Sequence, residues 1–580
     1  MPSKGWVHCT RSLCCMLFMC ASQWVCLPAY AATATEVEQA AREADRLLQL
    51  QQERETLRQK QIEERVRNPS GEVLPLPEVP GQVTKGVCKE IRRIYLDGAT
   101  VMPVEVKAAL LAPFEGHCIG LAEINQLLQS ITNYYVGKGY STTRAYIPEQ
   151  DMSGGELHIL VLEGLVEGIR IEGKGVSVAN AFPGLVGQIF NLREFEQGID
   201  QINRLQSNNA QIDIQPGSKP GTSIIVVKNK PSRPWTFNLA MDNTGSDSTG
   251  YYQSSATYGH DNLFGIEDYL NMSLRVNPDA DASEKLSRSL SGTYGVPFGR
   301  WTLTGSVSDY KYVSVVKGTA VDFTSSGVSG SANVRLDRVI FRNQDTKWTL
   351  SGGLTRKSSE NFINEEKITA NSRVLSVADL TSNLSVVGLG GLWSIDLGLS
   401  RGVDMFGALQ DPGNIANNAP RAQFAKVNYG VSLQRSFKLA EQNFNWQSNF
   451  SGQSASNVLY GSEQFLVGST SSVRGFRRYG ISGDSGAYWR NDLSMPMPLQ
   501  KLLGSSAPNG QIKPYVGYDL GHVFSHYDSS PGSVSGVTAG LNMSAGSWSV
   551  QASYSEAVKP PGSYVTNDDK YGYVRIAMDW

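Results

Sequence analysis

The most informative absence in this 580-residue chain is a long apolar run beyond its first 31 residues. A transmembrane helix needs about 18 or more consecutive apolar residues, and no later stretch comes near that length. This excludes a helical membrane span in the rest of the chain. A closed β-sheet can also cross a bilayer, and its signature is an alternation of apolar and polar residues.

An excess of charge of either sign is also missing. The chain has 52 Lys and Arg against 54 Asp and Glu, a formal net charge of −2. Nucleic-acid-binding proteins usually carry a basic excess, so we expect no nucleic-acid partner. No Gly-x4-Gly-Lys-Ser/Thr segment occurs, so an ATP site of that type is not expected.

Cysteine is scarce except at the start, where five of the seven lie in the first 26 residues. Two basic residues precede an apolar segment at 13–21, and Ala-Tyr-Ala at 29–31 is a small-x-small cleavage pattern. Together they predict a signal peptide over residues 1–31. The residue before Cys26 is not small, so a lipoprotein is not indicated. We expect an exported protein.

The mature chain keeps only Cys88 and Cys118. Two cysteines in an exported protein most often pair with each other, so we expect a disulfide. Zinc is the competing interpretation, but it needs four ligands. The mature histidines show no ligand spacing: His117, His158, His260, His522 and His526. We therefore expect no metal and no other cofactor.

Apolar and polar residues alternate through residues 231–580, for example at 235–242, 270–277, 301–308 and 393–400. Alternation puts one apolar and one polar row on opposite faces of a strand. A soluble β-sandwich also shows this pattern, with the apolar row inside. Several strands open on tryptophan, as an interfacial girdle requires: Trp235, Trp301, Trp348, Trp393 and Trp548. This favours a transmembrane barrel. At roughly 20 residues per strand with its connection, about 16 antiparallel strands fit, enough for a wet lumen.

The last strand supports this prediction. Val574, Ile576 and Trp580 share one face, while Arg575 and Asp579 share the other. An arginine facing the bilayer midplane costs about 2 to 4 kcal/mol, so we expect the charged face to line the lumen. A strand that ends on Trp580 resembles the C-terminal strand by which outer-membrane barrels are recognised and inserted.

Three smaller units precede the barrel. Residues 32–67 predict a helix that is polar on nearly every face and therefore solvated, and residues 68–86 form a proline-rich linker. Residues 87–165 and 166–230 each predict a strand, a helix and two further strands. In the first of these, a strand is expected at 91–96. Its main helix carries apolar residues at helical spacing: Leu121, Ile124, Leu128, Ile131 and Tyr135.

One short motif near the end of the chain carries chemistry. Val473, Arg474, Gly475 and Phe476 lie in a Gly- and Ser-rich run, and Asp519 follows in a strand-like segment. A planar guanidinium suits a carboxylate, and glycine permits a tight turn beside it. A solvated surface loop is the alternative interpretation of the motif alone.

The order of these units resembles the TpsB family, the outer-membrane transporters of two-partner secretion. Residues 131–150 are similar to that family's signature in its first POTRA domain, a small periplasmic module. Residues 261–265 and 294–299 resemble its early barrel. The resemblance covers essentially the whole mature chain and implies two POTRA domains followed by the barrel.

The resemblance also implies roles for named residues. The loop around 460–485 would fold into the lumen as a lid, with Val473–Phe476 at its tip and Asp519 and Gly521 as its docking site on the wall. The helix at 32–67 would plug the pore and withdraw during transport.

The implied function is export of a large partner exoprotein, such as a haemolysin, an adhesin or a contact-dependent inhibition toxin. The POTRA domains would capture its unfolded amino-terminal segment, most simply by strand addition to a sheet edge. The other implied partners are outer-membrane lipid and the barrel-assembly machinery. A barrel-assembly factor of the same superfamily is the alternative, and a passive porin would need no POTRA domains.

Two segments resemble serine-hydrolase motifs, Gly398–Gly402 and Gly483–Gly486. The nucleophile elbow needs a strand that leads into a helix, whereas these lie at a strand end and in a turn. We therefore expect no enzymatic activity.

Overall fold

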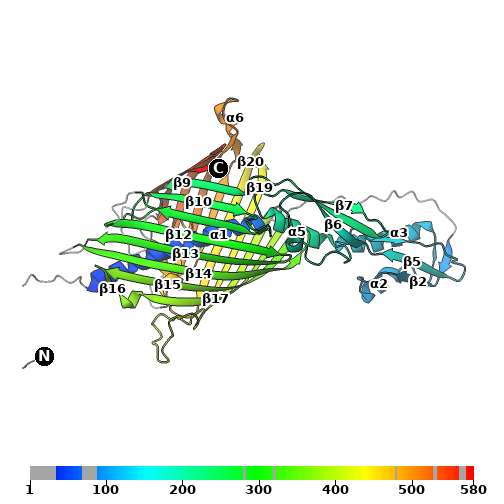
Figure 1. Ribbon diagram of the computed structural model, residues 1–580, viewed down its shortest axis with the longest axis horizontal. Coiled ribbons are helices and arrows are strands. Elements are labelled where there is room, and N and C mark those ends of the chain that lie inside the picture. The colour runs from blue at the N-terminus through cyan, green and yellow to red at the C-terminus, as the bar shows by residue number, and fades with distance from the viewer. Residues whose placement is uncertain are drawn as a thin grey trace, which may run out of the picture.

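The computed structural model describes residues 34–67, 88–278, 283–317, 322–476, 480–526, 532–560 and 570–580, with side chains in the first range at 40–58. The predicted signal peptide and proline-rich linker lie outside the described residues. Figure 1 shows a β-barrel that encloses one helix, with two small mixed domains extending from one end of the barrel.

The first small domain packs helices against a three-stranded sheet of order β2-β5-β4, in which β2 and β5 are parallel. Its core includes Leu127, Ile131, Tyr135, Leu157 and Ile159, all fully buried. Its elements are β1 (Lys89–Ile91), β2 (Arg93–Asp97), α2 (Val104–Leu111), β3 (His117–Ile119), α3 (Leu121–Gly137), β4 (Arg144–Tyr146) and β5 (Glu156–Leu162).

The expected strand at 91–96 is two strands in the structure. Residues 89–91 pair with β3, whereas 93–97 pair with β5. The N–H groups of Arg92 and Arg93 both donate to the Gly155 carbonyl oxygen, at 2.7 and 3.3 Å. The chain therefore changes partner at Arg92.

Cys88 and Cys118 are joined by a disulfide whose Cα atoms are 5.4 Å apart. The bridge holds the start of β1 to β3, since Glu90 lies opposite Cys118 in that pair.

Replacing both cysteines by serine is expected to lower the free energy of unfolding of the first domain by about 3 to 4 kcal/mol, because a loop of 30 residues is no longer closed in the unfolded state. Hydrogen exchange of the β2, β4 and β5 amides in the intact protein measures this. The β7 and β8 amides of the second domain are the internal control, and equal protection of the first domain in both proteins would contradict the expectation.

The second small domain repeats the plan with sheet order β6-β8-β7. Phe182, Phe190 and Phe195 are fully buried in its core, where Phe195 stacks on Phe190 and contacts Phe182 at ring-centroid distances of 5.1 and 5.4 Å. Its elements are β6 (Leu165–Gly173), α4 (Val178–Ala181), α5 (Leu192–Asn203), β7 (Ala210–Pro216) and β8 (Thr222–Asn229).

Helix α5 fastens this domain to the rim of the barrel. Asp200 is buried against Arg342, and the Lys347 ammonium lies 3.4 Å from the same carboxylate oxygen. Glu194 pairs with Arg300 at 2.6 Å. The second small domain is therefore fastened to one end of the barrel strands by ion pairs.

The barrel has 16 long antiparallel strands and closes by pairing of β28 with β9, which confirms the predicted fold class. The strands are β9 (Trp235–Asp242), β10 (Gln253–Asp261), β11 (Tyr269–Val276), β12 (Lys285–Phe298), β13 (Trp301–Val316), β14 (Phe323–Arg342), β15 (Thr346–Ile363), β17 (Arg373–Gly388), β18 (Gly391–Val403), β19 (Ala425–Leu439), β20 (Gln442–Ala455), β23 (Ser485–Ser494), β25 (Gly510–Phe524), β26 (Gly532–Ala545), β27 (Trp548–Lys559) and β28 (Lys570–Asp579). The short pieces β16 (Glu366–Lys367) and β24 (Met497–Pro498) extend two hairpins, beside η1 (Thr369–Asn371) and α6 (Leu499–Leu503).

The apolar rows of these strands face outward. Leu303, Val307, Leu397 and Ile576 are each more than 40% exposed, which is unfavourable in water and suits contact with lipid. A soluble sandwich would bury these rows, so that alternative is wrong. Arg575 lines the interior instead.

Trp580 lies at the seam. Its N–H donates to the Phe237 carbonyl oxygen at 2.8 Å, and the Phe237 N–H donates back at 3.2 Å. The two rings lie 5.8 Å apart. The last residue of the sequence thus takes part in joining β28 to β9.

Candidate functional site

Residues 456–484, which we call the luminal loop, connect β20 to β23, and the described parts, 456–476 and 480–484, fold back into the barrel. The loop contains η2 (Gly461–Glu463) and a small hairpin of β21 (Phe465–Val467) and β22 (Ile481–Gly483). At its tip, Val473 is fully buried and Arg474 and Phe476 are each 5% exposed. The structure therefore places the motif inside the barrel.

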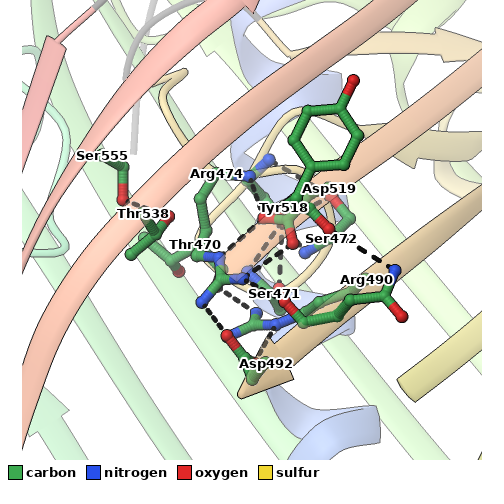
Figure 2. A network of polar contacts seen from close by, with 12 residues as sticks. Thr470, Ser471, Ser472, Arg474, Arg490, Asp492, Tyr518, Asp519, Thr538 and Ser555 are labelled. Atoms are coloured by element: carbon green, nitrogen blue, oxygen red, sulfur yellow. Dashed lines mark hydrogen bonds and ion pairs between the residues drawn. The ribbon is translucent and has the colours of Figure 1, made fainter. Parts of the chain in front are cut away.

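Arg474 reaches two carboxylates of the wall (Figure 2). Its Nε and Nη2 donate to the two oxygens of Asp519 on β25 at 2.6 and 2.7 Å, and its backbone N–H donates to the same carboxylate at 3.1 Å. Its Nη1 donates to Asp492 on β23 at 2.7 Å. Such a bidentate pair is strong and geometrically specific.

Glycines in the wall make room for this contact. A Cβ on Gly517 would lie 2.2 Å from Arg474 Nη2, and one on Gly521 would lie 2.9 Å from Val473 Cγ2. Both distances are too short for a real side chain. Gly475 has φ +102°, a region that favours glycine, and a Cβ there would lie 2.7 Å from the Ala557 nitrogen. Asp519 and Gly521 therefore present a fitted surface to the loop tip.

Apolar side chains seal the same contact. Val473 and Phe476 are buried with Val467 of the loop and with Val523 and Val534 of the wall. Asp519 is fully buried and Arg474 is 5% exposed, so breaking the pair would leave a charge with little access to solvent.

Helix α1 (Ala34–Arg67) runs through the lumen beside this loop (Figure 1). Ala40, Ala44 and Leu47 are buried, and Ala44 and Leu47 pack with Tyr310 and Tyr312 of the wall. The polar contacts of α1 to the wall include Asp45 with Arg373, Gln51 with Ser289 and Arg54 with the Thr244 carbonyl. The expectation of an all-round solvated helix is wrong, since Gln49 and Gln51 are also buried.

The luminal loop and α1 also touch each other. Ser469 Oγ donates to Glu53 at 2.9 Å, and the Gln49 amide donates to the Gly461 carbonyl. A cavity of about 1350 Å³ remains in the lumen, lined mainly by polar side chains. The interior is therefore partly filled by two elements that are not strands of the wall, and it is not a packed core.

Asp492 is a member of this network that the sequence analysis missed. It lies in β23, where Trp489 and Leu493 are exposed outward and Arg490 and Asp492 face inward. Arg490 also pairs with Asp492 at 3.3 Å and donates to the Thr470 carbonyl at 2.8 Å (Figure 2). The alternation in β23 was the available signal.

The residues of the two hydrolase-like segments have structural partners. Ser400 lies within β18 and donates to Asp379, and Ser485 Oγ accepts the Ala455 N–H at 3.0 Å. Asp484 accepts from the backbone N–H groups of Leu459 and His526, both at 2.7 Å.

Within the described ranges, no group of three or more His, Cys, Asp and Glu residues is placed to hold a metal ion. Among the helices that the structure describes, none is at once long and apolar enough to span a bilayer.

Comparisons with known proteins all point to one family. Residues 221–543 match the family model described as haemolysin secretion/activation protein ShlB/FhaC/HecB. Residues 90–164 match the ShlB-type POTRA domain, and residues 165–216 match a further POTRA domain model.

The chain is 32% identical over 522 residues to the outer membrane transporter CdiB of Dickeya dadantii (strain 3937), covering 90% of this chain and 92% of the relative. It is 31% identical over 475 residues to the hemolysin transporter protein ShlB of Serratia marcescens, with 81% and 82% covered. The solved structure of CdiB from Escherichia coli matches with a TM-score of 0.83 at 30% identity, covering 95% of this chain and all of that one. The chain therefore belongs to the haemolysin secretion/activation family, the outer-membrane transporters of two-partner secretion, and its POTRA domains lie in the periplasm.

Proposed function

We propose that this transporter exports one large exoprotein, of the haemolysin, adhesin or contact-dependent inhibition toxin kind, through its barrel, with α1 as a plug and the luminal loop as a lid. The observation that carries the proposal is the polar lumen that holds a polar helix and a latched loop. Neither element belongs to the wall, so both can move without unfolding the barrel. A partner segment that passes through must displace α1.

The proposed division of the chain follows from these roles. It comprises a signal peptide (1–31), the plug helix (32–67), the linker (68–86), two POTRA domains (87–165 and 166–230) and the barrel (231–580) with its lid (460–485). Val473–Phe476 would latch the lid on Asp519 and Gly521, and Trp580 would form part of the signal read by the barrel-assembly machinery. We propose contact with outer-membrane lipid through the exposed apolar rows, and no catalytic role.

The proposed capture step is strand addition in the periplasm. In the first POTRA domain, β4 is an edge strand that, among the residues the structure describes, pairs with β5 alone. A free edge offers main-chain donors and acceptors that bind an unfolded segment with little demand on its sequence. Tyr146 on β4 is 49% exposed.

A photo-crosslinking residue at Tyr146 is therefore expected to capture the partner's amino-terminal segment during secretion. Val104 on α2, which is 75% exposed, is the matched control away from this edge. The readout is the yield of the crosslinked product. Equal yields at both positions would contradict edge capture, and no export of the partner fragment in the presence of this chain would contradict the proposed function.

A further inference from the structure

Glu463 is a buried anion at the base of the luminal loop, in η2, and only 2% of it is exposed. Lys357 Nζ lies 2.6 Å from one carboxylate oxygen, and Lys426 Nζ lies 3.0 Å from the other. The Glu463 carbonyl accepts from Lys426 and from the Gln453 amide, both at 3.0 Å. The residue is thus held by main chain and side chain together.

The two lysines come from a different part of the wall than the carboxylates at the loop tip. Lys357 is on β15 and Lys426 is on β19, whereas Asp492 and Asp519 are on β23 and β25. The charges are arranged the opposite way from those at the tip, because at the base the loop supplies the anion and the wall supplies the cations. The luminal loop therefore has two attachments of opposite sign, at its base and at its tip.

The base attachment lies where α1 contacts the loop. A Cβ on Gly461 would lie 2.7 Å from Asp45 Cγ of α1, so the helix packs directly on that glycine. The Gly461 carbonyl accepts from Gln49 of α1. Arg373, which pairs with Asp45, lies over the ring of the adjacent Tyr460 at 4.7 Å.

We propose that Glu463 is a positioning residue for pore closure. Its two ion pairs hold Tyr460 and Gly461 against α1, so that the base of the loop forms a seat for the helix in addition to the Ser469–Glu53 contact nearer the tip. This inference rests on the proposed function of α1 as a plug. It separates two tasks within one loop, since the Arg474 attachment latches the lid and the Glu463 attachment retains the helix.

The direct test is the docking of α1 in the intact protein. In an Ala44→Cys variant, the thiol is buried between α1 and the wall tyrosines, and Cys88 and Cys118 are disulfide-bonded. Its reaction with a water-soluble maleimide reports release of the helix. Adding Glu463→Gln should raise the labelling rate about tenfold, because the two lysines lose their buried counter-charge.

A matched control and a second variant keep the test sharp. Glu360→Gln removes the carboxylate of an exposed pair with Lys367 at the end of β15 and should leave labelling unchanged. Lys357→Met with Lys426→Met should also accelerate labelling, by stranding the carboxylate. Combining these with Glu463→Gln should be less than additive, because no unpaired charge remains.

The outcomes separate this inference from the proposed function. An unchanged labelling rate in Glu463→Gln would overturn the proposed role of Glu463, provided that the protein shows the heat-modifiable mobility of a folded barrel. Fully additive effects of Glu463→Gln and the double lysine variant on the labelling rate would overturn it as well. Failure of α1 deletion to change conductance would overturn the plug, while faster labelling would still support the seat.

Discussion

Arg474→Ala is expected to reduce secretion of the partner exoprotein roughly tenfold or more, although the barrel still assembles. The variant leaves Asp519 fully buried and Asp492 largely buried, with their shared cation gone. Removing one member of a buried ion pair costs about 3 to 5 kcal/mol. That cost falls on the docked loop rather than on the strands, because the guanidinium touches the strand backbone weakly, through the Asn491 carbonyl at 3.4 Å. The measurement is the secreted fraction of the partner's amino-terminal fragment, normalised to the surface abundance of the transporter.

Two variants define what the loss means. Arg474→Lys keeps the charge but loses the fork that spans both Asp519 oxygens, so we expect partial secretion. Arg575→Ala removes another luminal arginine, on β28, and should leave secretion normal because the ion pairs of the loop stay intact. Normal secretion by the Arg474→Ala variant at normal surface abundance would contradict the proposed role of the Val473–Phe476 motif in export.

The barrel was predictable because its signal is repeated. Each strand carries the same alternation, and misjudging one of them leaves the class unchanged. The pairing of Arg474 with Asp519 could also be predicted from the sequence. Both residues lie among glycines and small residues, which leave space around a charge.

The rest of the network was not predictable from the sequence. Glu463 meets Lys357 and Lys426 from separations of 106 and 37 residues. Such contacts depend on which strands lie side by side and on how the loop folds across them, and alternation carries neither fact. Asp492 looked like one more member of a polar row.

Helix α1 shows how a sound local rule misleads. A helix that is polar all round needs polar surroundings, and the water of a wet pore was the expected source. The barrel wall supplies them instead, for example through Ser289 and Arg373.

In the first POTRA domain, Leu121 matched the helical spacing but is 60% exposed, while Leu127 is fully buried. Leu121 is the first residue of α3, where the helix has not yet reached the sheet.

Deleting residues 34–67 is expected to raise the ion conductance of the pore in planar bilayers severalfold. An α-helix with its side chains is about 10 to 12 Å wide, and its removal would join that volume to the existing cavity of about 1350 Å³. The wall around it is polar, so water and ions would fill the space. The single-channel current and the fraction of time open measure the effect, and unchanged values would contradict a plug.

A reversible tether gives the matched control for this deletion. Gln51 on α1 donates to Ser289 on β12 at 2.7 Å, so a cysteine at each position, bridged by a short dithiol that replaces the reach of the glutamine side chain, would join the helix to the wall on oxidation. We expect the oxidised protein to keep low conductance and to block secretion, and reduction to restore secretion. The tether keeps the whole helix present, with Gln51 as its one substituted residue, so it separates movement of the helix from its mere presence. Full secretion by the oxidised protein would mean that the partner passes with α1 still docked.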